Sequence, residues 1–288
     1  METPRQDTTP RGTGPQTSAE LFEEGRSLEK AGRFAEACTA YLAGLDRGPR
    51  DHRWLYRLGC AFLKQGRASE AETAFLEALD QDPANSTYLT NLGVALDRQG
   101  RREEAIRAYK KSNLDGRGTA VANHNLGAIY AEQGRRTEAI RAFEAAIALD
   151  PDAEGYLNLG LVHYAHEEYG EALSCFRQCV ERDASFARGH YYCGLCLMKS
   201  GNYREACRSF DRAWELDARL VRIPFHLGTC QHKLERFAEA KHSLERALEF
   251  FPEDGRLHYQ LALTCDALGM HQEARLHYGQ SRDAGRDG

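Results

Sequence analysis

The chain has 288 residues, of which 42% are hydrophobic and 28% are charged, and its formal net charge is −5. This composition is ordinary for a globular protein. The negative charge argues against nucleic acid as the main partner, because phosphate binding needs a basic surface, and no apolar run approaches the roughly 20 residues that cross a bilayer.

The first seventeen residues, METPRQDTTPRGTGPQT, are rich in Pro, Thr, Gly and charge and contain no apolar core. We therefore expect residues 1–17 to be a disordered tail and not a secretory signal. Nothing in the sequence directs the chain outward, so we expect a cytoplasmic protein whose nine cysteines are reduced thiols.

After the tail, the sequence repeats itself with a period of 34 residues. The stretch NLGVALDRQGRREEAIRAY, which begins at Asn91, returns from Asn125 as NLGAIYAEQGRRTEAIRAF. The predicted domain, residues 18–288, then consists of eight repeats, of which the fourth is one residue short: 18–51, 52–85, 86–119, 120–152, 153–186, 187–220, 221–254 and 255–288. Positions counted from the start of a repeat are called slots below.

Small and aromatic residues recur at fixed slots. The eighth slot is glycine in seven repeats, the twentieth is alanine in all eight, and the twenty-fourth is aromatic in seven, from Tyr41 and Phe75 to Tyr278. Apolar residues at helical spacing on both sides of a glycine break such as EQGRR predict two antiparallel helices per repeat. Glycine inside a helix costs about 1 kcal/mol against alanine, so we expect the eighth slot to permit close packing.

These glycines, alanines, aromatics and NLG triplets resemble the tetratricopeptide repeat family, and they cover everything after the tail. The resemblance implies an all-α fold, a right-handed α-solenoid superhelix of antiparallel helix pairs, whose inner surface binds peptides or other proteins. It implies no chemistry and no cofactor. The sequence likewise contains no phosphate loop, nucleophile elbow or dinucleotide fingerprint.

Polar residues stand at packing slots in the first and last repeats, namely Glu24, Arg275 and Arg282. A solenoid must cover its terminal faces with polar side chains, so we expect the eight repeats to be the complete array; chance drift at the ends is the alternative.

The third repeat ends in KKSNLDGRGTAVANH, where Asn113 takes an otherwise apolar slot and Gly116 and Gly118 loosen the chain. We expect a less rigid joint before residue 120, visible as faster hydrogen exchange over residues 113–119 than at other turns between repeats.

The resemblance places slots two, five, six, nine, twelve and thirteen on the inner surface. Slot six holds a row that is mostly polar: Arg57, Asn91, Asn125, Asn158, Tyr192, His226 and Gln260. An amide carries both a donor and an acceptor, so the asparagines could bind an extended peptide backbone of any sequence. The alternative is that asparagine is simply the usual residue at this slot.

Slots two and five place cations beside rings in the last three repeats: Arg188, Arg222 and Arg256 with Tyr191, Phe225 and Tyr259. Guanidinium groups bind carboxylates in a bidentate manner, and rings give apolar contact. These residues predict binding of an acidic segment with hydrophobic anchors; a solvated surface that binds nothing is the alternative. Phe22 and Tyr56 stand where the family's clamp for C-terminal carboxylates has lysine, so the resemblance does not extend to that clamp.

Four cysteines, Cys175, Cys179, Cys193 and Cys196, have a spacing that could hold zinc. Most of them occupy packing slots, where cysteine acts as a small hydrophobe. His163 and His166 could share a metal, but no third ligand is obvious. We therefore expect no metal and no other cofactor.

The sequence thus predicts a scaffold or adaptor without catalytic residues, which binds one or more proteins through extended segments and neither nucleic acid nor membrane. The first alternative is a substrate-recruiting module for a separately encoded enzyme, such as a protein glycosyltransferase. The second alternative is RNA binding, against which the net charge argues.

Overall fold

The computed structural model describes residues 16–114 and 118–284, which contain sixteen helices and no strand. The chain divides into two compact units, Met1–Ile129 and Tyr130–Gly288. The predicted all-α fold is therefore confirmed. Most of the predicted tail, residues 1–15, lies outside the described residues.

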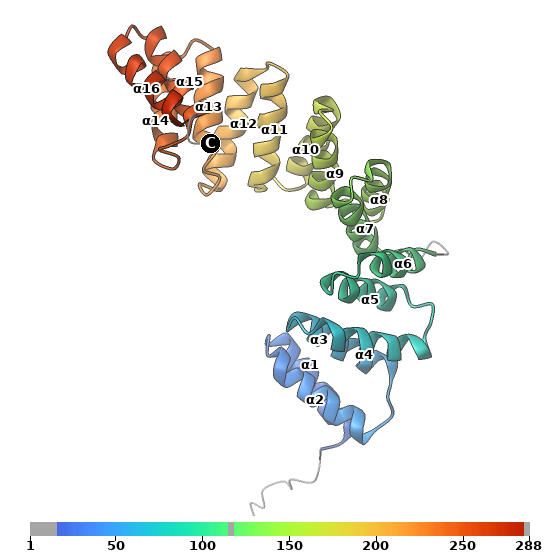
Figure 1. Cartoon of the computed structure of the whole chain (residues 1–288). Helices are drawn as coiled ribbons and strands as arrows, with labels where there is room; N and C mark the ends of the chain where they lie inside the picture. The colour runs from blue at the N-terminus through green and yellow to red at the C-terminus, as the bar shows by residue number, and fades with distance from the viewer. Residues whose placement is uncertain (1–15, 115–117, 285–288) are drawn as a thin grey trace, which may run out of the picture. The chain divides into compact units, whose positions relative to one another are not determined.

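The helices follow one another with short turns between them (Figure 1). Their bounds are α1 Ser18–Lys30, α2 Phe34–Arg47, α3 His52–Lys64, α4 Ala68–Gln81, α5 Ser86–Arg98, α6 Arg102–Ser112, α7 Ala120–Glu132, α8 Arg136–Leu149, α9 Ala153–Ala165, α10 Tyr169–Arg182, α11 Ala187–Lys199, α12 Tyr203–Leu216, α13 Ile223–Lys233, α14 Phe237–Leu248, α15 Gly255–Ala267 and α16 His271–Ala284.

Within each unit, helices that are consecutive in the sequence pack in pairs. In the first unit α1 packs on α2, α3 on α4 and α5 on α6, and successive pairs are joined by the contacts of α2 with α3 and of α4 with α5. The second unit repeats this arrangement from α8 to α16. Each unit is therefore an α-solenoid of helix pairs, as expected.

Most first helices of a pair begin at the first slot of their repeat, where a polar side chain often caps the helix. Asp51, Asn85 and Asp254, for example, each accept a backbone N–H from the first turn that follows. Helix α13 instead begins at Ile223, and its second residue is Pro224. Proline has no N–H and is tolerated in a first turn, which explains the later start.

In five of the described repeats the aromatic ring of slot twenty-four lies directly on the glycine of slot eight in the same repeat. A Cβ built on Gly93 would lie 2.5 Å from Cε1 of Tyr109, and one built on Gly160 would lie 2.6 Å from Cε1 of Phe176. Both rings are fully buried. The glycine is thus required by close packing, and burying each ring stabilises the pair by about 1.5–3 kcal/mol.

The predicted joint after the third repeat lies partly outside the described residues, which omit 115–117. Beside this gap, Asn113 Nδ2 donates a hydrogen bond of 2.6 Å to Asn123 Oδ1. None of the described helices has the length and the apolar character needed to cross a membrane.

Candidate functional site

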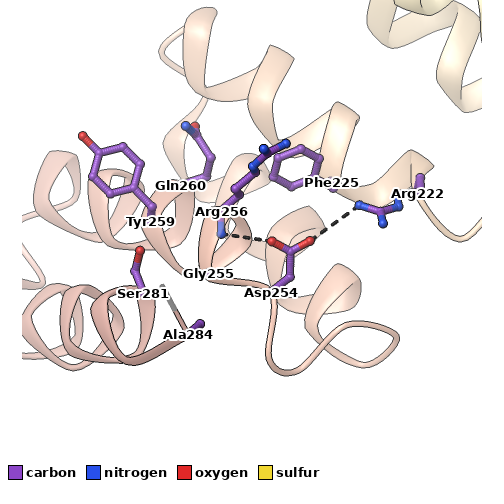
Figure 2. A pocket seen from close by; sticks show the side chains of 9 residues that line it. All are labelled: Arg222, Phe225, Asp254, Gly255, Arg256, Tyr259, Gln260, Ser281 and Ala284. Carbon is purple, nitrogen blue, oxygen red and sulfur yellow. Dashed lines mark hydrogen bonds and ion pairs between the residues drawn. The ribbon is translucent and has the colours of Figure 1, made fainter. Parts of the chain in front are cut away.

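The structure brings five of the predicted inner-surface residues together in the second unit. They line an open hollow of about 720 Å³ between α13, α15 and α16, called the C-terminal hollow below (Figure 2). Its lining consists of Arg222, Phe225, Asp254, Gly255, Arg256, Tyr259, Gln260, Ser281 and Ala284.

Asp254 contacts both arginines of this hollow. Its side chain caps α15 by accepting the backbone N–H of Arg256 at 2.9 Å, and it lies 3.5 Å from the guanidinium of Arg222 (Figure 2). The guanidinium of Arg222 also sits over the ring of Phe251, 4.6 Å from its centroid. Arg222 is therefore held in place before any ligand arrives.

The side chain of Arg256 has a different environment. It is exposed, and it makes no ion pair among the described residues. Its five N–H donors are therefore available to an anionic ligand. Tyr259, 47% exposed, and the half-buried Phe225 add ring surface to the same hollow.

The other predicted residues of the second unit do not line this hollow. Arg188 is exposed at the start of α11. Tyr191 Oη lies 3.3 Å from His226 Nε2, and the imidazole of His226 stacks on Phe210 with ring centroids 5.4 Å apart. Burial, and secondarily the charge of Arg222, lowers the pKa of His226 to about 4, so this ring is neutral at pH 7.

The residues of slot six reach back to the preceding repeat. Tyr192 stacks on Phe176 with centroids 5.1 Å apart, and Asn125 Nδ2 donates to Tyr109 Oη at 3.2 Å. Arg57 forms an ion pair of 3.1 Å with Glu29, which also accepts the hydroxyl of Tyr41.

Two further asparagines of slot six are partly buried. Asn91 Nδ2 donates to the carbonyl of Thr87 in its own helix at 2.9 Å. Asn158 occupies the same slot on α9 and is half-buried. Part of the hydrogen-bonding capacity of Asn91 and Asn125 is thus used inside the protein.

Three of the four cysteines considered as zinc ligands lie in the apolar core, whereas Cys175 is only partly buried. Cys179, Cys193 and Cys196 pack with Phe176 in one buried cluster, and burial raises the pKa of the Cys193 and Cys196 thiols to about 12. No group of three or more His, Cys, Asp or Glu in the described part of the chain is arranged to hold a metal ion. His163 Nδ1 lies 2.8 Å from Glu168.

Sequence reasoning did not identify Asp254, Gly255, Ser281 or Ala284 as part of the hollow. Asp254 carried a usable signal, since an aspartate directly before a helix is a capping residue and an arginine stands two residues later. Ser281 and Ala284 carried none, because they come from the second helix of the repeat, which the inner-surface slots do not include.

Comparison with known proteins gives a single family. One model of the tetratricopeptide repeat matches residues 22–86, 56–113, 157–219 and 232–287, and a second model of the same repeat matches residues 118–185. No curated protein matches the sequence.

Several solved structures have a similar fold. The C-terminal part of a TPR repeat-containing protein from Cytophaga hutchinsonii has a TM-score of 0.68 at 16% identity, over 83% of this chain and 99% of that one. A crystal structure of MamA has a TM-score of 0.52 at 27% identity, over 57% of this chain and 97% of that one. A chain of the APC/C hetero-tetramer Cut9–Hcn1 has a TM-score of 0.56 at 17% identity, over 86% of this chain and 51% of that one.

Proposed function

This chain belongs to the tetratricopeptide repeat family, and from that membership we propose that it is a scaffold without catalytic function, which binds an acidic, extended segment of a partner protein. The proposal rests on one observation, the C-terminal hollow with its two arginines and two rings. The similar fold in the Cut9–Hcn1 hetero-tetramer is consistent with a role in binding other proteins.

The two arginines offer an acidic segment different contacts. Arg256 has no carboxylate partner among the residues that the structure describes, so it provides charge-assisted hydrogen bonds without breaking a described pair. Arg222 already forms an ion pair with Asp254. Its guanidinium has enough N–H donors to bind a second carboxylate beside the first.

The rings define the apolar part of the ligand. Phe225 and Tyr259 lie one repeat apart at the same slot, and both line the hollow. A large apolar side chain next to the acidic residues of the ligand would remove this ring surface from water. The favoured ligand therefore combines carboxylates with one aromatic or large aliphatic residue.

A photo-crosslinking peptide tests this proposal. In the peptide, glutamates flank one benzoylphenylalanine, and mass spectrometry measures the yield of adducts on residues 221–284. We expect Arg256→Glu to lower that yield about tenfold at limiting peptide, because the attraction becomes a repulsion. Circular dichroism should give the same helical content for variant and parent.

Arg219→Glu is the matched control. Arg219 is 91% exposed and bonds to Asp217 at 2.9 Å, and it lies outside the hollow. Its reversal alters the net charge by the same amount and should leave the yield unchanged. Undiminished labelling of Arg256→Glu, or an equal loss in both variants, would refute binding at this hollow.

A further inference from the structure

A second hollow lies in the first unit, between α1, α3 and α5. It has a volume of about 520 Å³ and is called the N-terminal hollow below. Its lining combines three arginines with four rings: Arg26, Arg53 and Arg57 with Phe22, Trp54, Tyr56 and Tyr88, together with Asn85 and Thr87.

The two hollows use equivalent positions of the repeat. Arg53 stands at slot two, like Arg222 and Arg256, and Tyr56 stands at slot five, like Phe225 and Tyr259. A helix-capping residue at slot thirty-four also lines each hollow, Asn85 in one and Asp254 in the other. The repeat therefore places the same kinds of side chain around both hollows.

The lining of the N-terminal hollow presents guanidinium groups and no carboxylate. Arg26, Arg53 and Arg57 give three positive charges, and no aspartate or glutamate is among the lining residues, although the whole chain has a net charge of −5. Each arginine pairs with one carboxylate just outside the hollow, so the lining favours an anionic ligand through its guanidinium N–H donors and not through net charge.

Carboxylates outside the hollow hold the arginines in position. Asp51 lies 2.6 Å from Arg53, Glu23 lies 2.9 Å from Arg26, and Glu29 lies 3.1 Å from Arg57. Each guanidinium has five donors, so one such bridge leaves N–H groups for a ligand. The side chain of Arg53 remains 72% exposed, so a ligand can reach it.

The rings form two stacked pairs. Phe22 lies on Trp54 with centroids 4.4 Å apart and planes 12° apart, and Tyr56 lies on Tyr88 with centroids 4.9 Å apart. Trp54 and Tyr56 are only partly buried, so both pairs offer surface to an apolar side chain. Pre-stacked rings lose little conformational freedom when they bind.

We propose that the N-terminal hollow is a second binding site for an acidic protein segment with an aromatic anchor, so that one chain binds two such segments. The proposal takes its ligand class from the proposed function but concerns different residues in the other unit. It is therefore tested separately.

Tryptophan fluorescence reports on this hollow alone. The chain has two tryptophans. The second, Trp214, belongs to α12 in the other unit, where the guanidinium of Arg246 lies over its ring. In a Trp214→Phe background, Trp54 is the remaining tryptophan. We expect a tryptophan-free peptide in which glutamates flank one phenylalanine to change Trp54 emission in a saturable manner.

Two variants in that background locate the binding. Arg53→Glu should weaken the Trp54 response about tenfold, whereas Arg219→Glu, a reversal at an equivalent arginine–aspartate pair outside both hollows, should leave it unchanged. If Arg53→Glu loses helical content, Arg26→Ala takes its place with a smaller expected loss. A peptide with lysine in place of glutamate should give no response.

The outcomes separate the two proposals. No change in Trp54 emission, together with continued crosslinking to residues 221–284, would overturn the second site and leave the first in place. A Trp54 response without that crosslinking would overturn the first site and leave the second in place. A response that is equal for the lysine peptide, or unaffected by the arginine variants, would also overturn the second site.

Discussion

The residues at slot six, which we expect to face the inner surface, also make contacts inside the protein. Asn125, Tyr192 and His226 each contact the slot-twenty-four ring of the preceding repeat. Slot six thus links neighbouring repeats. A row of asparagines there need not reflect selection for a peptide backbone, because part of each amide can already be used within the array.

His226 gives this packing a pH dependence. Its pKa falls from an unfolded value near 6.5 to about 4, so below pH 6.5 the unfolded chain binds a proton that the folded chain does not. Stability should therefore be constant above pH 7 and fall as the pH is lowered from 6.5 towards 4. Between pH 7 and 5 we expect the loss from this group to be about 2 kcal/mol.

Thermal denaturation of His226→Asn at pH 7 and pH 5 measures this effect. Asparagine is the residue at slot six in three other repeats, so it fits the site, and it carries no proton-binding group. The variant should lose less stability on acidification than the parent. An equal loss in the two proteins would show that His226 is not the group responsible.

The sequence identified the residues of the C-terminal hollow more easily than their interactions. Repeat slots showed that Arg222, Arg256 and Tyr259 share one surface. They did not show that Asp254 pairs with the first arginine and leaves the second available, because this depends on side-chain geometry between neighbouring helices. Phe22 and Tyr56 were considered only as replacements for lysine, and their stacking on Trp54 and Tyr88 was not foreseen.

At the scale of the element, the turn between paired helices places one residue at positive φ, and this residue is glycine in some repeats and glutamate in others. Six turns place glycine at positive φ, such as Gly100 at 77° and Gly134 at 70°. Glu167 and Glu235 occupy the same slot with φ of 62° and 61°. A side chain with a Cβ is strained in this region, so the turn is imposed by the packing of the helices on either side.

Replacing Glu167 by glycine should therefore stabilise the protein. We expect a gain of about 0.5–1 kcal/mol, the relief of strain being partly offset by the greater freedom of glycine in the unfolded chain. The midpoint of thermal denaturation measures it. Glu171→Gly, an exposed position in the first turn of α10, is the control and should be destabilising. A loss in both variants would contradict the strain argument.

Helix boundaries were predictable to different degrees. Capping residues such as Asp51 and Asn85 mark the start of α3 and α5 in the sequence. The late start of α13 follows from Pro224, which was not used in the prediction. As a result Arg222 occupies the N-cap position of α13, without a capping hydrogen bond from its side chain, whereas Arg188 and Arg256 lie within their helices.

At the scale of the whole molecule, each unit is held together by contacts between near neighbours in the sequence. Helices contact the next helix, or the equivalent helix one pair away, as α3 contacts α5 and α13 contacts α15. Stability in such an array is the sum of repeat and interface terms, so damage should remain local.

Gly93→Ala tests this locality. The added Cβ would lie 2.5 Å from the buried ring of Tyr109, and we expect a cost of about 1–3 kcal/mol. Hydrogen exchange should accelerate in α4, α5 and α6 and remain unchanged in α13–α15. Gly279→Ala, which meets no atom within 4 Å, is the control and should accelerate exchange nowhere. Equal acceleration in α13–α15 would contradict additive behaviour.

The repeat period predicted the helix pairs because one pattern was observed eight times, and chance does not produce glycine, alanine and aromatic residues together at constant spacing. No sequence pattern predicted the division of the chain into two compact units after Ile129. It falls within α7, inside an ordinary repeat, and depends on how densely the helices contact one another rather than on any local composition.

In five of the described helix pairs a ring rests on a glycine of the same repeat, and in the pair of α13 and α14 the side chain of Leu244 takes the place of the ring. Duplication or loss of a whole repeat would leave this contact intact in every remaining pair, because both of its partners belong to the same repeat. Genes of this design can therefore change length by recombination in whole modules, and an additional copy can diverge at its inner-surface slots while its internal fit is preserved.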